Sequence, residues 1–208
     1  MPVTQATCRL PYAHLNLRRN PFGEFSEDER TALALVDVDA IITRLDDPQY
    51  VVQFVGEKGY GKTTHLLAIR SRLRDAGYVH IPEGERAPIP SGCPILIDEA
   101  QRLTCWQQLQ VFRSNIPLVL GTHRDFHRQL RLAGRVVETI DVQQGTDVER
   151  LHRLLNARIQ WVRRSDGQIP SITSETAEYL RNEHGADVRA VLHQLYAVFQ
   201  DLNEIADL

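Results

Sequence analysis

The chain has 208 residues, of which 42% are hydrophobic, and its formal net charge is −3. This length suits one sizeable core, or one domain with a small appendage, and the charge excludes a chain built throughout as a polycation for nucleic acid. No apolar run approaches the ~20 residues that span a bilayer, and the start lacks the basic flank and apolar region of a secretory signal. Cys8, Cys93 and Cys105 are scattered, with neither disulfide nor metal spacing, which predicts a cytoplasmic protein.

The first segment, residues 1–27, has an irregular pattern rich in proline. The residue before a proline avoids the helical region, so "RRNPFGEF" predicts an extended arm. Within this arm Pro21 or Phe22 could frame an adenine ring, and the other interpretation is an arm that only packs on a sheet. Residues 26–45 then combine a capping-box pair, Ser26 and Glu29, with apolar residues at helical spacing, which predicts one helix.

Strand and helix patterns alternate from residue 50 to residue 142. The predicted strands are 50–55, 78–81, 94–98, 116–122 and 135–142. The predicted helices between them are 63–77, 99–115 and 123–134. Such alternation predicts an α/β fold, with a parallel sheet of about five strands flanked by helices. Only proline-rich residues 82–93 connect the second and third strands, which leaves little room for a helix there.

The last part of the chain changes to an all-helical pattern. Helical spacing covers residues 146–164, 173–185 and 186–208. A boundary near residues 143–146 divides this part from the strands. We therefore expect three regions, which are an N-terminal arm (1–27), an α/β core domain (28–143) and a small helical lid (144–208).

The stretch "GEKGYGKT", from Gly56 to Thr63, fits the phosphate-loop pattern G-x-x-x-x-G-K-[ST] and lies between a predicted strand and a predicted helix. Glycines let consecutive backbone N–H groups point at phosphate oxygens, and the helix N-terminus adds positive potential. Lys62 would reach the β- and γ-phosphates of ATP, and the Thr63 hydroxyl would coordinate Mg²⁺. The residues predicted to contact nucleotide are Gly56, Lys58, Gly59, Tyr60, Gly61, Lys62, Thr63 and Thr64.

Two acidic residues end the predicted strand 94–98. The apolar run of "PILIDE" places Asp98 at the carboxyl end of its strand, where ligands bind in folds with a parallel sheet. Asp98 is predicted to hold Mg²⁺ through water, together with Thr63. Glu99 is predicted to polarise the water that attacks the γ-phosphate. The other interpretation is that both acids simply begin a capped helix, where the helix dipole favours negative charge.

These motifs resemble those of AAA+ P-loop ATPases over roughly residues 18–200. The resemblance rests on "GEKGYGKTT", the Walker B segment "ILIDEAQ", the strand "PLVLGT" and the tail "GADVRAVLHQL", in that order. "DEAQ" and the upstream "RNPF" are similar to a compact bacterial group that includes ExeA-type secretion ATPases and transposition-helper ATPases. The segment 82–93 departs from the family, which usually has a helix and a pore loop there. This departure argues against a threading motor.

The resemblance implies further site residues. Thr122 matches the sensor-1 position, where many relatives have asparagine, and Arg189 matches sensor 2 in the lid. Arg135 lies where an arginine finger often completes a neighbouring subunit's site, and Arg131 and Arg128 compete for that role. Each of these arginines has the alternative interpretation of a solvated surface charge.

The sequence thus predicts an ATP-binding, Mg²⁺-dependent ATPase that acts as a switch and passes its ATP or ADP state to an unidentified protein partner or a DNA complex. A finger in trans would require a homo-oligomer. A basic run at residues 123–135 could meet DNA phosphates, or it could be a solvated helix face. Two alternatives remain open, which are a P-loop kinase of a small molecule and a non-hydrolysing ATP-binding adaptor.

Overall fold

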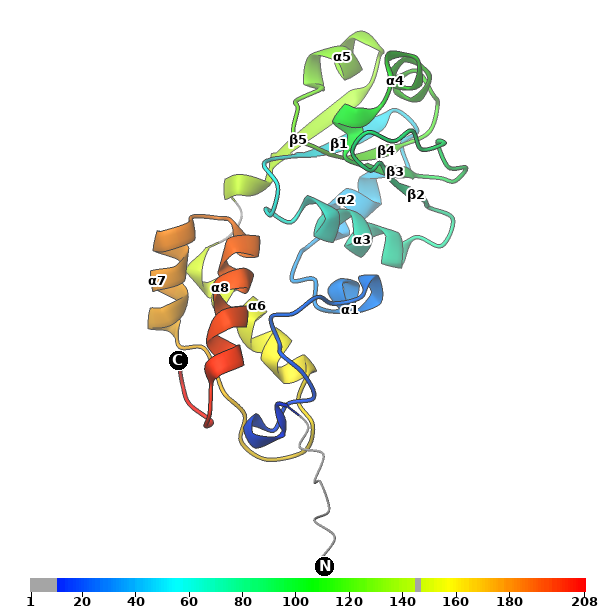
Figure 1. Ribbon diagram of the computed structural model, residues 1–208. Coiled ribbons are helices and arrows are strands. Elements are labelled where there is room, and N and C mark those ends of the chain that lie inside the picture. Colours follow the sequence, from blue (N-terminus) through cyan, green and yellow to red (C-terminus); the bar gives the residue numbers. More distant parts are fainter. Residues whose placement is uncertain (1–10, 145–146) are drawn as a thin grey trace, which may run out of the picture. The chain divides into compact units, whose positions relative to one another are not determined.

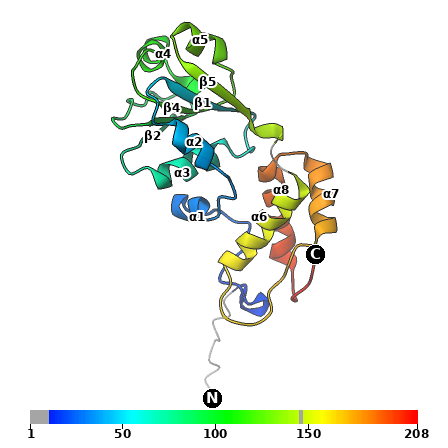
Figure 2. The ribbon, with the colours of Figure 1, turned by 180° about the vertical axis from the view of Figure 1, so that it is seen from behind.

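The computed structural model describes residues 11–144 and 147–208, which form two compact units. The α/β unit is Ser26–Thr146, and the helical unit combines the segment up to Phe25 with Asp147–Leu208. Figures 1 and 2 show both units from opposite sides. Cys8, the start of the expected arm and part of the expected boundary at residues 145–146 lie outside the described residues.

The α/β unit is built on a five-stranded parallel sheet with the order β2-β3-β4-β1-β5. Its strands are β1 (Tyr50–Val55), β2 (Gly77–His80), β3 (Ile95–Asp98), β4 (Leu118–Thr122) and β5 (Val136–Asp141). This confirms the predicted α/β fold class. The register aligns Asp98 with Gly121 and Val55 with Thr122, so the ends of the three central strands meet at one edge of the sheet.

Helices cover both faces of this sheet, as Figure 1 shows. The helices of the α/β unit are α1 (Glu27–Ala32), α2 (Asp39–Arg44), α3 (Lys62–Arg72), α4 (Cys105–Phe112), α5 (His127–Leu132) and the short 3-10 helices η2 (Ala100–Arg102) and η3 (Val142–Gln144). Successive residues of a strand face opposite sides. Accordingly Val52 packs in a core with residues of α2 and α3, whereas Val51 packs in a second core with residues of α4 and α5.

The single helix expected over residues 26–45 is two helices, α1 and α2. The capping box of Ser26 and Glu29 is present at the start of α1. The prediction of one helix was wrong because the chain is not helical between Ala32 and Asp39, where the Asp37 carboxylate accepts from the Asp39 N–H at 3.1 Å. An aspartate that bonds the backbone two residues ahead favours a turn over a continuous helix.

The segment after Asp98 also departs from the expected continuous helix over residues 99–115. Glu99 has a φ of +63°, in the left-handed region, and the short helix η2 follows it. The helix α4 begins only at Cys105, where Thr104 and Gln107 form a capping box. The acids at 98 and 99 therefore do not begin an α-helix. As expected, residues 82–93 contain neither helix nor strand.

The helical unit contains α6 (Val148–Trp161), α7 (Ser174–His184), α8 (Val188–Asp201) and the 3-10 helix η1 (Ala13–Leu15). Residues 11–25 pack against these helices. The Phe22 ring lies 4.9 Å from that of Phe199, and Arg158 donates to the carbonyls of Pro21 and Gly23 at 2.9 and 2.8 Å. Phe22 is therefore a core residue of the helical unit, and neither interpretation of the arm foresaw this packing. No helix in the described ranges is long and apolar enough to cross a membrane.

Candidate functional site

The predicted phosphate loop connects β1 to α3. Its first residue, Gly56, donates its N–H to the Thr122 carbonyl at 3.2 Å, so the loop leaves the sheet beside the end of β4. Gly61 has a φ of +86° and is the N-cap of α3, a conformation that a residue with a side chain rarely adopts. The first N–H groups of an α-helix lack partners within the helix. The first N–H groups of α3 are thus available as donors to an anion, and the binding of phosphate by this loop stays a prediction.

Lys62 is the first residue of α3, and its side chain turns back beneath the loop. Its ammonium donates to the carbonyls of Gly56 and Glu57, both at 2.8 Å, and lies 3.5 Å from Nε2 of His123. The residue is only 5% exposed. A lysine held in this position keeps a positive charge at the loop, which suits the binding of a polyphosphate.

Thr63 and Asp98 are in direct contact. The Thr63 hydroxyl donates to Oδ2 of Asp98 at 2.8 Å, and Nδ1 of His80 lies 3.1 Å from the same oxygen. Asp98 is buried at the end of β3. Gly121 on β4 leaves room for it, because a Cβ there would lie 2.8 Å from Oδ1 of Asp98.

A hydroxyl and a carboxylate oxygen at this spacing fit Mg²⁺, which binds few protein oxygens and completes its shell with water and phosphate. Within the described residues there is no group of three or more His, Cys, Asp or Glu side chains that could hold a metal ion by itself. Thr63 and Asp98 are thus the residues that would hold Mg²⁺ when a nucleotide supplies the remaining ligands.

Glu99 lies next to this pair and is 8% exposed. Its Oε2 accepts from Nε2 of Gln101 at 2.8 Å and lies 3.3 Å from Arg102, while Oε1 lies 3.5 Å from His123. Burial raises the pKa of Glu99, but the hydrogen bond from Gln101 and the basic groups Arg102, His123 and Lys62 outweigh it, so the pKa is lowered overall. The carboxylate is therefore ionised at neutral pH and able to accept a proton.

The predicted sensor residue Thr122 is buried at the end of β4. Its hydroxyl donates to the Arg124 carbonyl at 2.8 Å and accepts from the Arg124 N–H at 2.9 Å, so it stabilises the turn that follows. The next residue, His123, faces Lys62 and Glu99 instead. The sequence analysis did not include His123 and Gln101 among the site residues. Two signals pointed to them, because His123 directly follows a predicted strand and Gln101 lies two residues after Glu99.

Arg135 lies inside the α/β unit, 1% exposed, just before β5. Its guanidinium donates to the backbone carbonyls of Ser114 and Ile116, and burial lowers its pKa. This placement does not suit an arginine finger, which has to reach the nucleotide of another subunit. The two competing residues, Arg128 and Arg131, are exposed on α5.

Replacing Arg135 with methionine is expected to lower the free energy of unfolding by about 3 kcal/mol, because two partly buried carbonyls lose a charged donor. Chemical denaturation of the variant measures this loss. Arg128→Met is the matched control, since Arg128 is exposed, and its effect should stay within about 0.5 kcal/mol. Equal stability of the two variants would contradict the structural role assigned to Arg135.

Arg189, the predicted sensor-2 residue, belongs to the helical unit. It is exposed near the start of α8, whose N-cap Asp187 accepts from its backbone N–H at 3.0 Å. It lines a shallow pocket of about 560 Å³ on this unit. The pocket is formed by Glu183, His184, Asp187, Arg189, Ala190, His193 and Gln194. The role of Arg189 toward nucleotide stays a prediction.

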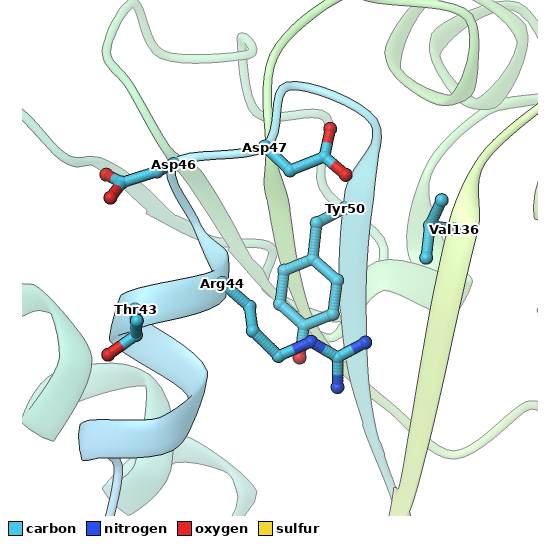
Figure 3. Close-up of a pocket in the computed structure, with 6 residues that line it drawn as sticks. All are labelled: Thr43, Arg44, Asp46, Asp47, Tyr50 and Val136. Carbon is cyan, nitrogen blue, oxygen red and sulfur yellow. The ribbon is translucent and has the colours of Figure 1, made fainter.

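A second pocket, of about 430 Å³, lies on the α/β unit and is drawn in Figure 3. Its lining residues are Thr43, Arg44, Asp46, Asp47, Tyr50 and Val136. Burial and a hydrogen bond to Glu138 raise the pKa of Tyr50, and the Arg44 guanidinium lies 4.4 Å from the centre of its ring. Tyr50 and Val136 are the first residues of β1 and β5. This pocket therefore lies at the amino-terminal ends of the strands, whereas the phosphate loop follows the carboxyl end of β1.

The fold is thus a five-stranded parallel sheet of order β2-β3-β4-β1-β5 with flanking helices, accompanied by a helical unit. Solved structures that share it include mutant forms of RuvB from Thermotoga maritima. One is 18% identical with a TM-score of 0.54. The matched region covers 88% of this chain and 66%, just under two thirds, of the RuvB chain. Another is 18% identical with a TM-score of 0.52, and the match covers 91% of this chain and 70% of the RuvB chain. A third is 19% identical with a TM-score of 0.54, and the match covers 88% of this chain and 66% of the RuvB chain.

At these identities the likeness establishes the fold. No family model matches the sequence. No curated protein matches it either. A further structure of Thermotoga maritima RuvB, described as a Holliday junction branch migration motor, is less similar, with a TM-score of 0.49 at 20% identity over 83% of this chain and 60% of that structure.

Proposed function

We propose that the protein binds ATP with Mg²⁺, hydrolyses it, and acts as a switch that couples its nucleotide state to a partner. The observation that carries the proposal is the meeting of Lys62, the Thr63–Asp98 pair and Glu99 at the carboxyl ends of adjacent strands. Ligands bind at this edge of parallel α/β sheets. The assignment of this chain to the ExeA-type and transposition-helper group remains part of the proposal.

Each residue has a separate role in the proposed reaction. The loop N–H groups and the Lys62 ammonium bind the β- and γ-phosphates, and Thr63 and Asp98 hold Mg²⁺, which would neutralise phosphate charge. Glu99 orients a water in line with the γ-phosphate and accepts its proton as the oxygen attacks phosphorus and the bond to the ADP oxygen breaks. The hydrogen bond from Gln101 and the nearby basic groups lower the pKa of Glu99 and keep its carboxylate ionised.

A switch requires that residues outside the phosphate loop respond to whether ATP or ADP is bound. We propose that Arg189 brings the helical unit under the influence of the nucleotide, as sensor 2 does in the AAA+ proteins that the sequence resembles. Because Arg135 is buried, Arg128 and Arg131 are the candidates for a finger that completes the site of a second copy. A homo-oligomer that hydrolyses ATP and signals to a protein or DNA partner is the assembly that these roles support.

Phosphate release from ATP by the purified chain, measured in Mg²⁺ over a range of protein concentrations, tests this function. We expect turnover per chain to rise with concentration, because a finger in trans acts only in an assembly. The assay is repeated with duplex DNA, where a rise in turnover would identify DNA as the partner. ATP that binds without turnover at any concentration would favour the non-hydrolysing adaptor. Phosphate found on a small-molecule acceptor instead of water would favour the kinase.

A further inference from the structure

The amide of Gln101 connects the ends of two strands in the α/β unit. Its Nε2 donates to Oε2 of Glu99 at 2.8 Å, and its Oε1 accepts from the backbone N–H of His123 at 3.2 Å. Glu99 follows β3, His123 follows β4, and these strands are neighbours in the sheet. One side chain therefore joins the carboxylate after β3 to the backbone after β4.

The amide of Gln101 has the chemistry for both contacts, because it carries a donor and an acceptor. An ionised carboxylate accepts hydrogen bonds and a backbone N–H donates one, so the bridging group needs a donor facing Glu99 and an acceptor facing His123. A glutamate at position 101 would keep the acceptor but turn a second carboxylate toward Glu99, and a leucine would offer neither group. The same requirement determines which way the Gln101 amide points.

This bridge closes a ring of contacts that reaches the phosphate loop. Nε2 of His123 lies 3.5 Å from Oε1 of Glu99 and 3.5 Å from the Lys62 ammonium. Because Gln101 holds Glu99 by its side chain and His123 by its backbone, it restrains both partners of the contact between imidazole and carboxylate. These contacts thus connect the end of β4 to Glu99.

We propose that Gln101 is a positioning residue that orients Glu99 toward the attacking water and couples that orientation to the end of β4 beside Lys62. The inference rests on the proposed ATP hydrolysis and deepens it. Gln101 acts on the reaction through Glu99 and makes no contact with the phosphates in this scheme.

Steady-state ATP hydrolysis by Gln101→Glu and Gln101→Leu tests the inference. We expect Gln101→Glu to lower kcat by at least about 30-fold and Gln101→Leu by about 10-fold, while KM for ATP changes less than about threefold because the phosphate loop is untouched. Gln108→Leu is the matched control. Gln108 donates to the Leu103 carbonyl at 3.0 Å on the side of α4, and its kcat should stay within about twofold of wild type.

A double variant separates positioning from a structural role. If Gln101 acts through Glu99, then adding Gln101→Leu to Glu99→Gln lowers the residual rate by less than about twofold. Three results would overturn the inference. The first is that the losses of rate multiply in the double variant, and the second is that kcat is unchanged in both single variants. The third is that a fall in Tm of more than about 5 °C explains the loss of kcat in both single variants. A wild-type chain that never hydrolyses ATP would overturn the proposed function and this inference with it, whereas active wild type with active Gln101 variants would overturn the inference alone.

Discussion

Replacing Glu99 with glutamine is expected to lower ATP turnover by at least about 100-fold and to leave ATP affinity within about threefold of wild type. The change removes the group that accepts the proton of the attacking water. It keeps the size of the side chain and an oxygen that can accept from Gln101, which donates to Glu99 in the structure. The proposed phosphate contacts come from the loop after β1, so binding should persist. Phosphate release gives the turnover, and titration with a fluorescent ATP analogue gives the affinity.

Glu85→Gln is the matched control for this substitution. Glu85 is exposed in the connection between β2 and β3, and its loss should change turnover by less than about twofold. Unchanged turnover in Glu99→Gln would remove Glu99 from the mechanism. A parallel loss of ATP binding would instead assign Glu99 to the binding of nucleotide.

Replacing Lys62 with methionine is expected to weaken ATP binding by about 100-fold, or about 2.8 kcal/mol. The substitution removes a buried ammonium that the loop carbonyls hold at 2.8 Å and leaves a side chain of similar length. Lys58, which is exposed in the same loop, provides the comparison. Lys58→Met should cost less than about threefold, because the predicted role of that residue is carried by its backbone.

The composition of the chain sharpens this measurement, because Lys58 and Lys62 are its two lysines. An amine-reactive acyl phosphate of ATP should label Lys62 in preference to Lys58, and excess ATP with Mg²⁺ should block the labelling. Peptide mass spectrometry distinguishes the two sites. Equal labelling of both lysines that ATP does not change would mean that the loop holds no nucleotide.

Local patterns in the sequence predicted the parts of the fold that depend on local chemistry. Alternating apolar runs located all five strands, and the spacing from Gly56 to Thr63 located the loop, because both depend on residues next to one another in the chain. At the break between α1 and α2 the Asp37 carboxylate accepts from the Asp39 N–H, a contact that competes with helical hydrogen bonding. A helical period alone cannot reveal such competition.

At the site, the sequence could not predict which side chains point toward the phosphate loop. Thr122 and His123 are adjacent, yet one hydroxyl closes a turn while the next side chain faces Lys62. A motif position does not determine which of two neighbours points into a site. Arg135 shows the same limit for burial, because an arginine before a strand reads as surface charge until the carbonyls of Ser114 and Ile116 are seen around it.

The chain passes between its two units twice, once after Phe25 and once before Asp147. In mechanical terms the α/β unit is an insert joined by two tethers, since residues 11–25 and the last helices share one core. Deleting residues 11–25 would therefore break one of the two connections and also remove Phe22 from its contact with Phe199, so the helical unit of a shortened chain would lose part of its own core.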